Sequence, residues 1–288
     1  MLRLLIISVF FICGPVQAAG ERLLFYKLGK ADAEVYLLGS MHLARAEIYP
    51  LRAGIMQAFA SAGTLAVELD ISGANQLQIQ QMILARGSYP PGETIRDHVS
   101  ATTWQSLQRH MSGTGLPVQV LERMRPGLLV TTLSSLEMMK LGLSAELGID
   151  RYFLDQARGQ KRIHELETVE QQVSLLLDFP QEDLLVRQTL EQLDNMEAIM
   201  EELVSVWKRG DAAALQKLLL EDELAKNPEF RSVYERLFDQ RNRAMSKQVE
   251  GFLRSPGRYF VVVGAGHLVG EQGIVSLLRK RGYAPQQL

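Results

Sequence analysis

Two stretches decide the fold: Val35-Tyr36-Leu37-Leu38-Gly39-Ser40-Met41-His42-Leu43 and Tyr259-Phe260-Val261-Val262-Val263-Gly264-Ala265-Gly266-His267-Leu268. Each is a short apolar run, rich in β-branched and aromatic side chains, that stops at a glycine and then offers a histidine. Such a run is typical of a buried strand. In sheets covered by helices, binding sites gather beyond the carboxyl ends of the strands. We therefore expect an α/β fold with a central β-sheet, in which two Gly-x-x-His loops from opposite ends of the chain share one site.

A carboxylate follows a third strand-like run in the same way. Glu68 comes directly after Thr64-Leu65-Ala66-Val67. Two imidazoles and one carboxylate can hold a divalent cation and leave positions open for water and substrate. We therefore hypothesise that His42, Glu68 and His267 bind a divalent metal. A single histidine or glutamate after a strand is more often only hydrogen-bonded or solvated. The repeated motif, in a chain with five histidines, is what favours a shared site.

Other polar residues are candidates for supporting roles. A metal-dependent hydrolase also needs a general base or a group that stabilises charge. Glu165 and Glu167 follow the strand candidate 161–164 and could supply the base, but each could equally be a solvated loop carboxylate. Arg241 and Asn242 lie on a predicted helix and could hold a carboxylate or an oxyanion, although such residues on a helix are more often ordinary surface groups.

Several familiar motifs are absent. His164-Glu165 begins like the zinc-protease HExxH motif, but Thr168 stands where the second histidine must be. The glycines at 264 and 266 lack the spacing of nucleotide-binding loops, and the chain contains no Gly-x-Ser-x-Gly elbow. His98 and His110 fall in amphipathic helical segments, where we expect structural roles.

Composition excludes some classes of function. The chain has 288 residues, 47% of them hydrophobic, with 31 basic and 33 acidic side chains. This is an ordinary globular composition, long enough for a substantial core. The near-neutral balance provides no electrostatic footprint for nucleic acid, so we expect no nucleic-acid partner.

The first 18 residues have the features of a secretory signal peptide. Arg3 precedes an apolar stretch over residues 4–13, and small residues at 16–18 form a cleavage site. The alternative is an uncleaved anchor, although the apolar stretch is short for spanning a membrane. Cys13 is the only cysteine, so the mature protein should contain no thiol. We expect export across the inner membrane to the periplasm, with no stable membrane anchor after cleavage.

The mature chain, residues 19–288, reads as one domain with a large helical insertion. A hairpin is expected from residues 23–28 and 34–38. From about residue 74 to about 254 most segments have helical periodicity, including one long candidate over 183–208. We expect this insertion to pack over the α/β core.

Taken together, the motifs resemble the TraB/GumN family, which is related to the Tiki metalloproteases. The resemblance rests on Gly39-Ser40-Met41-His42, Glu68, the segment 147–153, Leu166-Glu167-Thr168 with Glu170-Gln171, Arg241-Asn242 and Gly264-Ala265-Gly266-His267. It implies an α/β core with a metal-dependent active site at the paired motifs. Carried over to this chain, it makes His42, Glu68 and His267 the metal candidates and Glu167, Arg241 and Asn242 the catalytic support. For Tiki relatives it implies peptide-bond hydrolysis with a manganese- or cobalt-type ion.

The function we expect from the sequence is that of an exported metal-dependent hydrolase, a metallopeptidase acting on a peptide or protein substrate. The ion would be Mn, Co or Zn. Water on the metal would attack a peptide carbonyl, with Glu167 as base and Arg241 or Asn242 stabilising charge. The rival is a non-catalytic protein that sequesters a peptide or a haem-like ligand in the same cleft. A third possibility keeps the metal but cleaves another bond, such as an ester.

Overall fold

The structure, a computed structural model, describes residues 23–70, 76–179 and 181–288. The predicted signal peptide, residues 1–18, lies outside the described residues. The chain divides into two compact units. The sheet unit comprises residues 23–70, 143–167 and 200–288, and the helical unit comprises residues 76–142 and 168–199 apart from residue 180.

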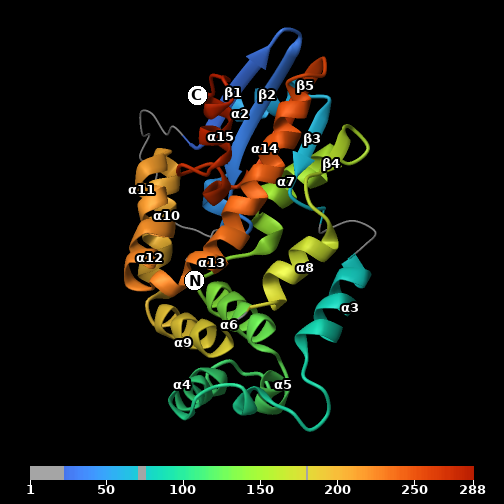
Figure 1. Cartoon of the computed structure of the whole chain (residues 1–288). Helices are drawn as coiled ribbons and strands as arrows, with labels where there is room; N and C mark the ends of the chain where they lie inside the picture. The colour runs from blue at the N-terminus through green and yellow to red at the C-terminus, as the bar shows by residue number, and fades with distance from the viewer. Residues whose placement is uncertain (1–22, 71–75, 180) are drawn as a thin grey trace. The chain divides into compact units, whose positions relative to one another are not determined.

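All the described strands belong to the sheet unit and form one six-stranded sheet in the order β4-β3-β5-β2-β1-β6 (Figure 1). Their bounds are β1 Phe25–Lys30, β2 Ala33–Ser40, β3 Thr64–Val67, β4 Arg162–Glu165, β5 Gly257–Gly264 and β6 Gln286–Gln287. The predicted hairpin is confirmed, because β1 and β2 pair antiparallel around a tight turn at residues 31–32. The predicted α/β class with a central sheet is confirmed as well.

Four strands run parallel, and this places their carboxyl ends at one edge. β2 pairs with β5, β5 with β3, and β3 with β4. The register sets Ser40 opposite Gly264 at the ends of β2 and β5. Val67, the residue before Glu68, pairs with Val262 on one side and Glu165 on the other. Residues far apart in sequence therefore leave the sheet side by side.

Alternate residues of β5 pack against helices on opposite faces of the sheet, as the pleat of a strand requires. On one face, the ring of Phe260 contacts Phe59 of α2 (Ala53–Ser61) and Phe153 of α7 (Ile149–Ala157), with centroids 5.5 and 4.9 Å apart. On the other face, Tyr259 stacks on Phe252 of α14 (Gln240–Phe252) at 4.7 Å. This double burial explains why β5 is an unbroken apolar run.

The rest of the sheet unit is helical. Its remaining helices are α11 Ala212–Gln216, α12 Asp222–Lys226, α13 Arg231–Tyr234 and α15 Ile274–Lys280, with π-helical turns at Lys217–Glu221 and Glu235–Asp239. Asp211 caps α11 by accepting a hydrogen bond from the backbone N–H of Ala214.

The helical unit contains α3 Gln76–Gly87, α4 Ala101–Ser112, α5 Val118–Glu122, α6 Pro126–Lys140, α8 Val169–Leu177 and α9 Glu182–Leu193. The single long helix predicted over 183–208 is wrong, because α9 ends at Leu193 and α10 begins at Met196. Asp194 and Asn195 occupy the break, and side chains of this type compete for backbone hydrogen bonds and disfavour helix interiors. Residues 200–254 group with the sheet unit, not with the other helices of the predicted insertion.

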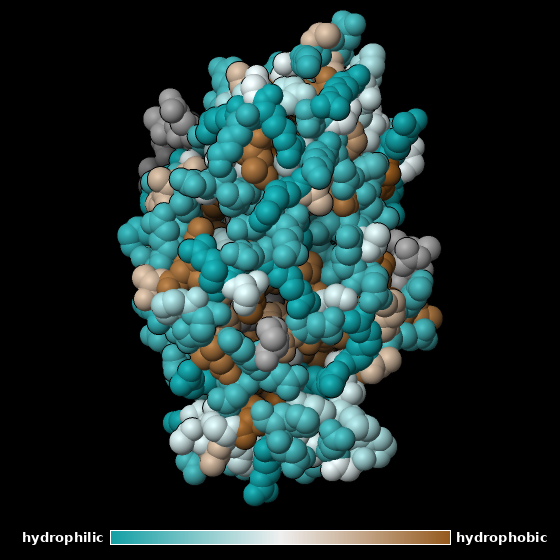
Figure 2. All heavy atoms as spheres, viewed as in Figure 1, coloured by the Kyte–Doolittle hydropathy of each residue, from teal (hydrophilic) through white to brown (hydrophobic). Residues whose placement is uncertain are grey.

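On the face drawn in Figure 2, the side chains are mostly hydrophilic, and the hydrophobic ones form small separate patches. Across the described residues, no helix has the length and apolar character needed to cross a membrane.

Candidate functional site

His42 lies in the loop after β2, against the start of α7. The backbone N–H of Ile149 donates to the carbonyl of Met41 at 2.9 Å. A Cβ on Gly148 would overlap the carbonyl oxygen of His42, so this close approach requires glycine. The approach brings Asp150, in the first turn of α7, to His42: Nδ1 and Oδ2 lie 2.8 Å apart. The other oxygen of Asp150 accepts from the hydroxyl of Ser40 at 2.8 Å.

His267 lies in the 3₁₀ turn Ala265–His267 that follows β5. Its Nδ1 donates to Oδ1 of Asn242 at 2.6 Å. Because an amide oxygen only accepts, the neutral ring carries its proton on Nδ1 and leaves Nε2 without one. The ring also contacts Phe238, with centroids 5.2 Å apart. Unlike His42, whose side chain is 39% exposed, His267 has a side chain only 4% exposed.

Glu68 follows β3 and is held from two sides. Its Oε1 accepts from the backbone N–H of Gly264 at 2.7 Å, and its Oε2 accepts from Arg241 at 2.6 Å. Arg241 also donates to both oxygens of Glu167, at 2.7 and 2.6 Å. Glu167 is tied to the same place through its backbone, since its N–H donates to the carbonyl of Glu68 at 2.9 Å. One guanidinium therefore joins two buried carboxylates, a charge-assisted arrangement that fixes all three groups.

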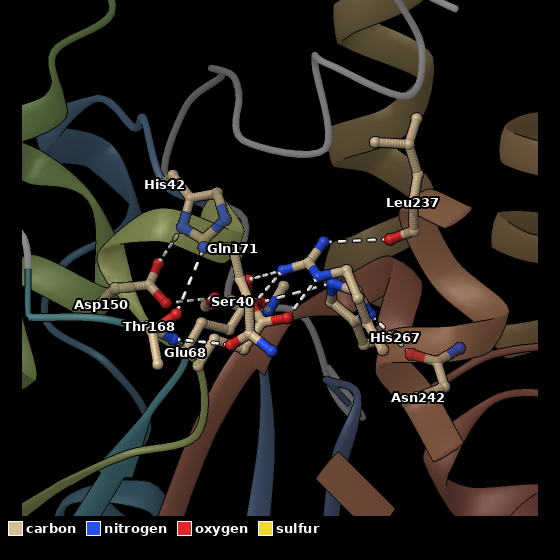
Figure 3. A network of polar contacts seen from close by, with 12 residues as sticks. Ser40, His42, Glu68, Asp150, Thr168, Gln171, Leu237, Asn242 and His267 are labelled. Carbon is tan, nitrogen blue, oxygen red and sulfur yellow. Dashed lines mark hydrogen bonds and ion pairs between the residues drawn. The ribbon is translucent and has the colours of Figure 1, made fainter. Parts of the chain in front are cut away.

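The three candidate ligands converge above Gly264. A Cβ built there would lie 3.3 Å from Oε1 of Glu68, 3.6 Å from Nε2 of His42 and 3.6 Å from Cδ2 of His267. Figure 3 shows the two imidazoles on opposite sides of the polar network, His42 with Asp150 and His267 with Asn242. Both rings have Nδ1 engaged, and within the described residues neither Nε2 has a hydrogen-bond partner within 3 Å.

The two imidazoles have opposite electrostatics. Burial lowers the pKa of His42, but the Asp150 carboxylate more than offsets this and raises it to about 9. Burial lowers the pKa of His267 to about 3, and the nearby Arg241 guanidinium adds to that effect. The metal-free site thus has one protonated and one neutral imidazole at neutral pH.

The carboxylate of Glu68 is ionised. Burial alone would raise its pKa, but His267 and the Arg241 guanidinium hold the pKa well below the usual range. An anionic carboxylate keeps its capacity to accept further bonds, because each oxygen has two lone pairs.

The donor groups fit a divalent cation. Nε2 of His267 and Oε1 of Glu68 lie 3.5 Å apart. Two tetrahedral ligands at about 2.1 Å from an ion stand roughly 3.4 Å from each other. A hydrogen bond from the second ring nitrogen to a carboxylate or amide oxygen is also the usual way to orient a metal-binding histidine. Within the described residues, however, no three His, Cys, Asp or Glu side chains already form a complete metal site.

The net charge of the cluster also favours the binding of a cation. The side chains of Glu68, Glu167 and Asp150 are 8%, 6% and 13% exposed, and Arg241 is the guanidinium among them. Three carboxylates, one guanidinium and the protonated His42 imidazole leave one net negative charge in the metal-free site. When His42 loses its proton to bind a metal, two negative charges remain, which one divalent cation would cancel. Uncompensated charge with little exposure is costly, so a cation of this valence would stabilise the deprotonated cluster.

All six predicted site residues lie in this cluster, and the other candidates do not. The Glu165 carboxylate accepts from the backbone N–H of Asp70 at 2.9 Å and is exposed. His98 stacks on Tyr89 and His110 contacts Asp194, both within the helical unit. These contacts agree with structural roles for the two histidines.

Two functional neighbours were missed by reasoning from residue types. Asp150 orients His42, and its only local signal is an acidic residue in the first turn of a helix after a glycine. Trp207 is buried and donates from Nε1 to the carbonyl of Gly39 at 2.9 Å. That bond holds the end of β2, where the His42 loop begins. A tryptophan in a long apolar helical stripe carries no mark of this role.

The amino-acid sequence is similar to one protein family and to several known proteins. The model of the TraB/PrgY/gumN family matches residues 24–287. Uncharacterized protein YbaP of Escherichia coli (strain K12) is 28% identical over 246 residues, which cover 85% of this chain and 87% of that protein. Metalloprotease TIKI1 of Danio rerio is 24% identical over 308 residues, covering 88% of this chain and 61% of that protein. The human Metalloprotease TIKI1 is also 24% identical, with 88% and 60% covered. No solved structure shows significant similarity.

Proposed function

The chain belongs to the TraB/PrgY/gumN family, and from that premise we propose that it is a metal-dependent hydrolase that cleaves peptide bonds. One observation carries the proposal. Two imidazoles from opposite ends of the chain have Nδ1 fixed by an oxygen, and their Nε2 edges meet the Glu68 carboxylate above Gly264. Two imidazole nitrogens and one carboxylate are the ligand set of many hydrolytic metal centres. The distant relatives named metalloproteases support the same reading.

The contacts of each residue in the cluster support a separate role in the proposed metal site. His42, Glu68 and His267 would hold the cation. Asp150 and Asn242 orient the two rings, and Arg241 locks Glu68 in place. The chemistry that a divalent cation supplies when bound is activation of a water molecule and polarisation of a carbonyl group.

A general base needs an oxygen that can accept a proton. Both oxygens of Glu167 accept from Arg241, and each has a second lone pair that can take a proton. We retain Glu167 as the proposed base and Arg241 as the group that stabilises developing charge. Glu167→Gln separates the two roles. It keeps one oxygen to accept from Arg241 but removes the basicity, so a base should lose activity at unchanged metal content.

The ion, the substrate and the compartment are parts of the proposal as well. Imidazole and carboxylate ligands suit Mn, Co or Zn. A peptide or protein substrate is proposed because distant relatives are named metalloproteases. Export to the periplasm is proposed because residues 1–18 have the features of a signal peptide.

A second candidate is favoured by the pair of His42 and Asp150. A half-exposed imidazole whose Nδ1 is held by a carboxylate can act as a general base on water without a metal once it has lost its proton, which its pKa of about 9 places at alkaline pH. In that case Glu68 and Arg241 would bind the polarised substrate. Activity that persists after complete metal removal would favour this candidate.

The test is cleavage of a peptide library by the chain without residues 1–18, with each candidate metal added in turn and products identified by mass spectrometry. Wild type should cleave, and His42→Ala and His267→Ala should not. His110→Gln is the matched control, because it removes an imidazole from the helical unit and should leave cleavage unchanged. Absence of any cleavage with all three metals would favour a sequestering protein. Equal cleavage by wild type and both alanine variants would refute the site.

A further inference from the structure

A cavity of about 560 Å³ lies within the sheet unit, beside the candidate metal centre but not part of it. Its walls come from the segment 216–242 and from the loop that follows β5. Neither His42 nor Glu68 lines it. Cavities of roughly 300–1,000 Å³ are typical of small-molecule sites.

The cavity begins directly behind His267. Asn242, whose oxygen holds Nδ1 of His267, lines the cavity, and so does Gly266. Figure 3 shows Asn242 on the side of His267 that faces away from His42. The cavity and the candidate metal centre therefore lie on opposite edges of one imidazole ring.

Two buried polar side chains line the cavity with hydrogen-bonding groups to spare. Asn242 is 2% exposed and Tyr234 is 5% exposed. In the described part of the chain, the side-chain bond of Asn242 is the one from its Oδ1 to His267, and no partner is seen for its Nδ2 or for the hydroxyl of Tyr234. Neither atom is among the fully buried polar atoms that lack a partner. Both donors are therefore open to solvent or to a ligand in the cavity.

The remaining walls are aromatic and acidic. The rings of Tyr234 and Phe238 stack with centroids 4.6 Å apart and an interplanar angle of 24°. Glu221, Asp239 and Glu271 line the cavity, with Arg231 as the only cationic residue among those that line it. A ligand with a positive charge would therefore be favoured over an anion.

The two π-helical turns of the sheet unit both reach this cavity. Lys217–Glu221 contributes Glu221, and Glu235–Asp239 contributes Phe238 and Asp239. Such turns are rare, cost regular hydrogen bonding and are frequent at functional sites. In this chain both π-helical turns lie at residues that line the cavity.

We propose that this cavity is a binding site for a small amphipathic amine, a molecule with an apolar or aromatic body, a carbonyl group and a positive charge. The body packs on Phe238 and Tyr234. The carbonyl accepts from Asn242, and the ammonium group lies near Asp239. An amino-acid amide is the smallest ligand with all three features. This inference does not depend on catalysis, because it rests on the cavity alone.

L-Phenylalaninamide is the probe, measured by calorimetry with the chelator-treated chain so that metal binding cannot contribute. We expect saturable binding of one equivalent. N-acetyl-L-phenylalaninamide lacks the charge, and free phenylalanine adds a carboxylate. Each should bind about tenfold more weakly, the effect of losing one charged contact or adding a like-charge repulsion.

Variants place the probe in the cavity. Asp239→Asn and Tyr234→Phe should each weaken binding about fivefold to tenfold. Glu235→Gln is the matched control, since Glu235 is an exposed acid on the same turn that does not line the cavity. His42→Ala should bind the probe as wild type does, which separates this site from the metal centre. No saturable binding to wild type, or no preference for the charged amide, would overturn the proposal. Equal weakening by Glu235→Gln would overturn it as well.

Discussion

The two Gly-x-x-His loops have the same motif and opposite surroundings. His42 is 39% exposed, bonds to a carboxylate and has a pKa raised to about 9. His267 is 4% exposed, bonds to a neutral amide and has a pKa lowered to about 3. The motif places an imidazole at the end of a strand. The residue that bonds to its Nδ1, Asp150 or Asn242, lies on a helix distant in sequence and influences its charge. In the metal-free protein, one ring is thus buried and neutral, and the other is partly exposed and protonated.

Because of this difference, the two loops would contribute to metal binding in different ways. His267 and Glu68 already have the spacing of two ligands, whereas His42 must lose a proton before it can bind a cation. The loop after β5 is therefore the fixed half of the site and the loop after β2 is its adjustable half.

Removing Arg241 should have the largest effect on stability. Arg241→Met leaves the buried carboxylates of Glu68 and Glu167 without their shared counter-charge, which costs about 3–5 kcal/mol in comparable buried pairs. Urea unfolding measures the change. Arg243→Met, an exposed residue on the same helix, is the control and should change stability little. A loss below about 1 kcal/mol, the range of surface ion pairs, would show that the cluster is solvated.

The two histidines should differ in their contributions to stability. His267→Ala removes a buried ring and leaves Oδ1 of Asn242 unpaired, so we expect a loss of about 2–3 kcal/mol. His42→Ala, at a half-exposed position, should cost less than about 1 kcal/mol above pH 9, where the bond to Asp150 no longer adds stability. Both values come from unfolding of the metal-free chain above pH 9. Equal losses would contradict the distinction between fixed and adjustable halves.

Trp207 should matter for the position of the adjustable loop. Trp207→Phe removes the donor that bonds to the carbonyl of Gly39 at the end of β2, and should cost about 1–2 kcal/mol. Trp104→Phe, in the helical unit, is the matched control because the chain contains two tryptophans. If Trp207→Phe weakens metal binding no more than Trp104→Phe does, the bond does not position His42.

The pair of His42 and Asp150 should make stability depend on pH. The folded pKa of about 9 lies above the ordinary value of 6.5. The stabilisation is therefore fully present below pH 6.5 and is lost as the pH rises through 9. Asp150→Asn should remove this dependence in the metal-free chain. Unfolding below and above this window measures it, with Asp194→Asn, at the partner of His110, as the control. A stability advantage of wild type over Asp150→Asn that grows with pH would contradict the sign.

Much of the sheet unit could be predicted because its signals are local. The apolar runs of β2, β3 and β5 have strand composition, and the residues that follow each strand proved to be neighbours because the strands are parallel. Short patterns also predict the caps at Asp211 in the sheet unit and at Thr168 in the helical unit. Gly282-Tyr283-Ala284-Pro285 suggests a short edge strand, and strand β6 lies slightly later, at Gln286–Gln287.

The polar network could be predicted only in part because its contacts join distant positions. Asp150 lies 108 residues from His42, and Trp207 lies 168 residues from Gly39. No periodicity or composition marks such pairs. The opposite charges of the two imidazoles were equally out of reach, since the Gly-x-x-His motif is the same in both loops. The break between α9 and α10 was missed because the apolar stripe continues across it.

Metal stoichiometry tests the central claim most directly. Titration of the chelator-treated chain with Mn²⁺, Co²⁺ or Zn²⁺ should show one equivalent bound to wild type. His42→Ala, Glu68→Ala and His267→Ala should each lose that binding, whereas His110→Gln should retain it. Wild type that binds none of the three ions, or one equivalent retained by all three alanine variants, would contradict the shared metal site.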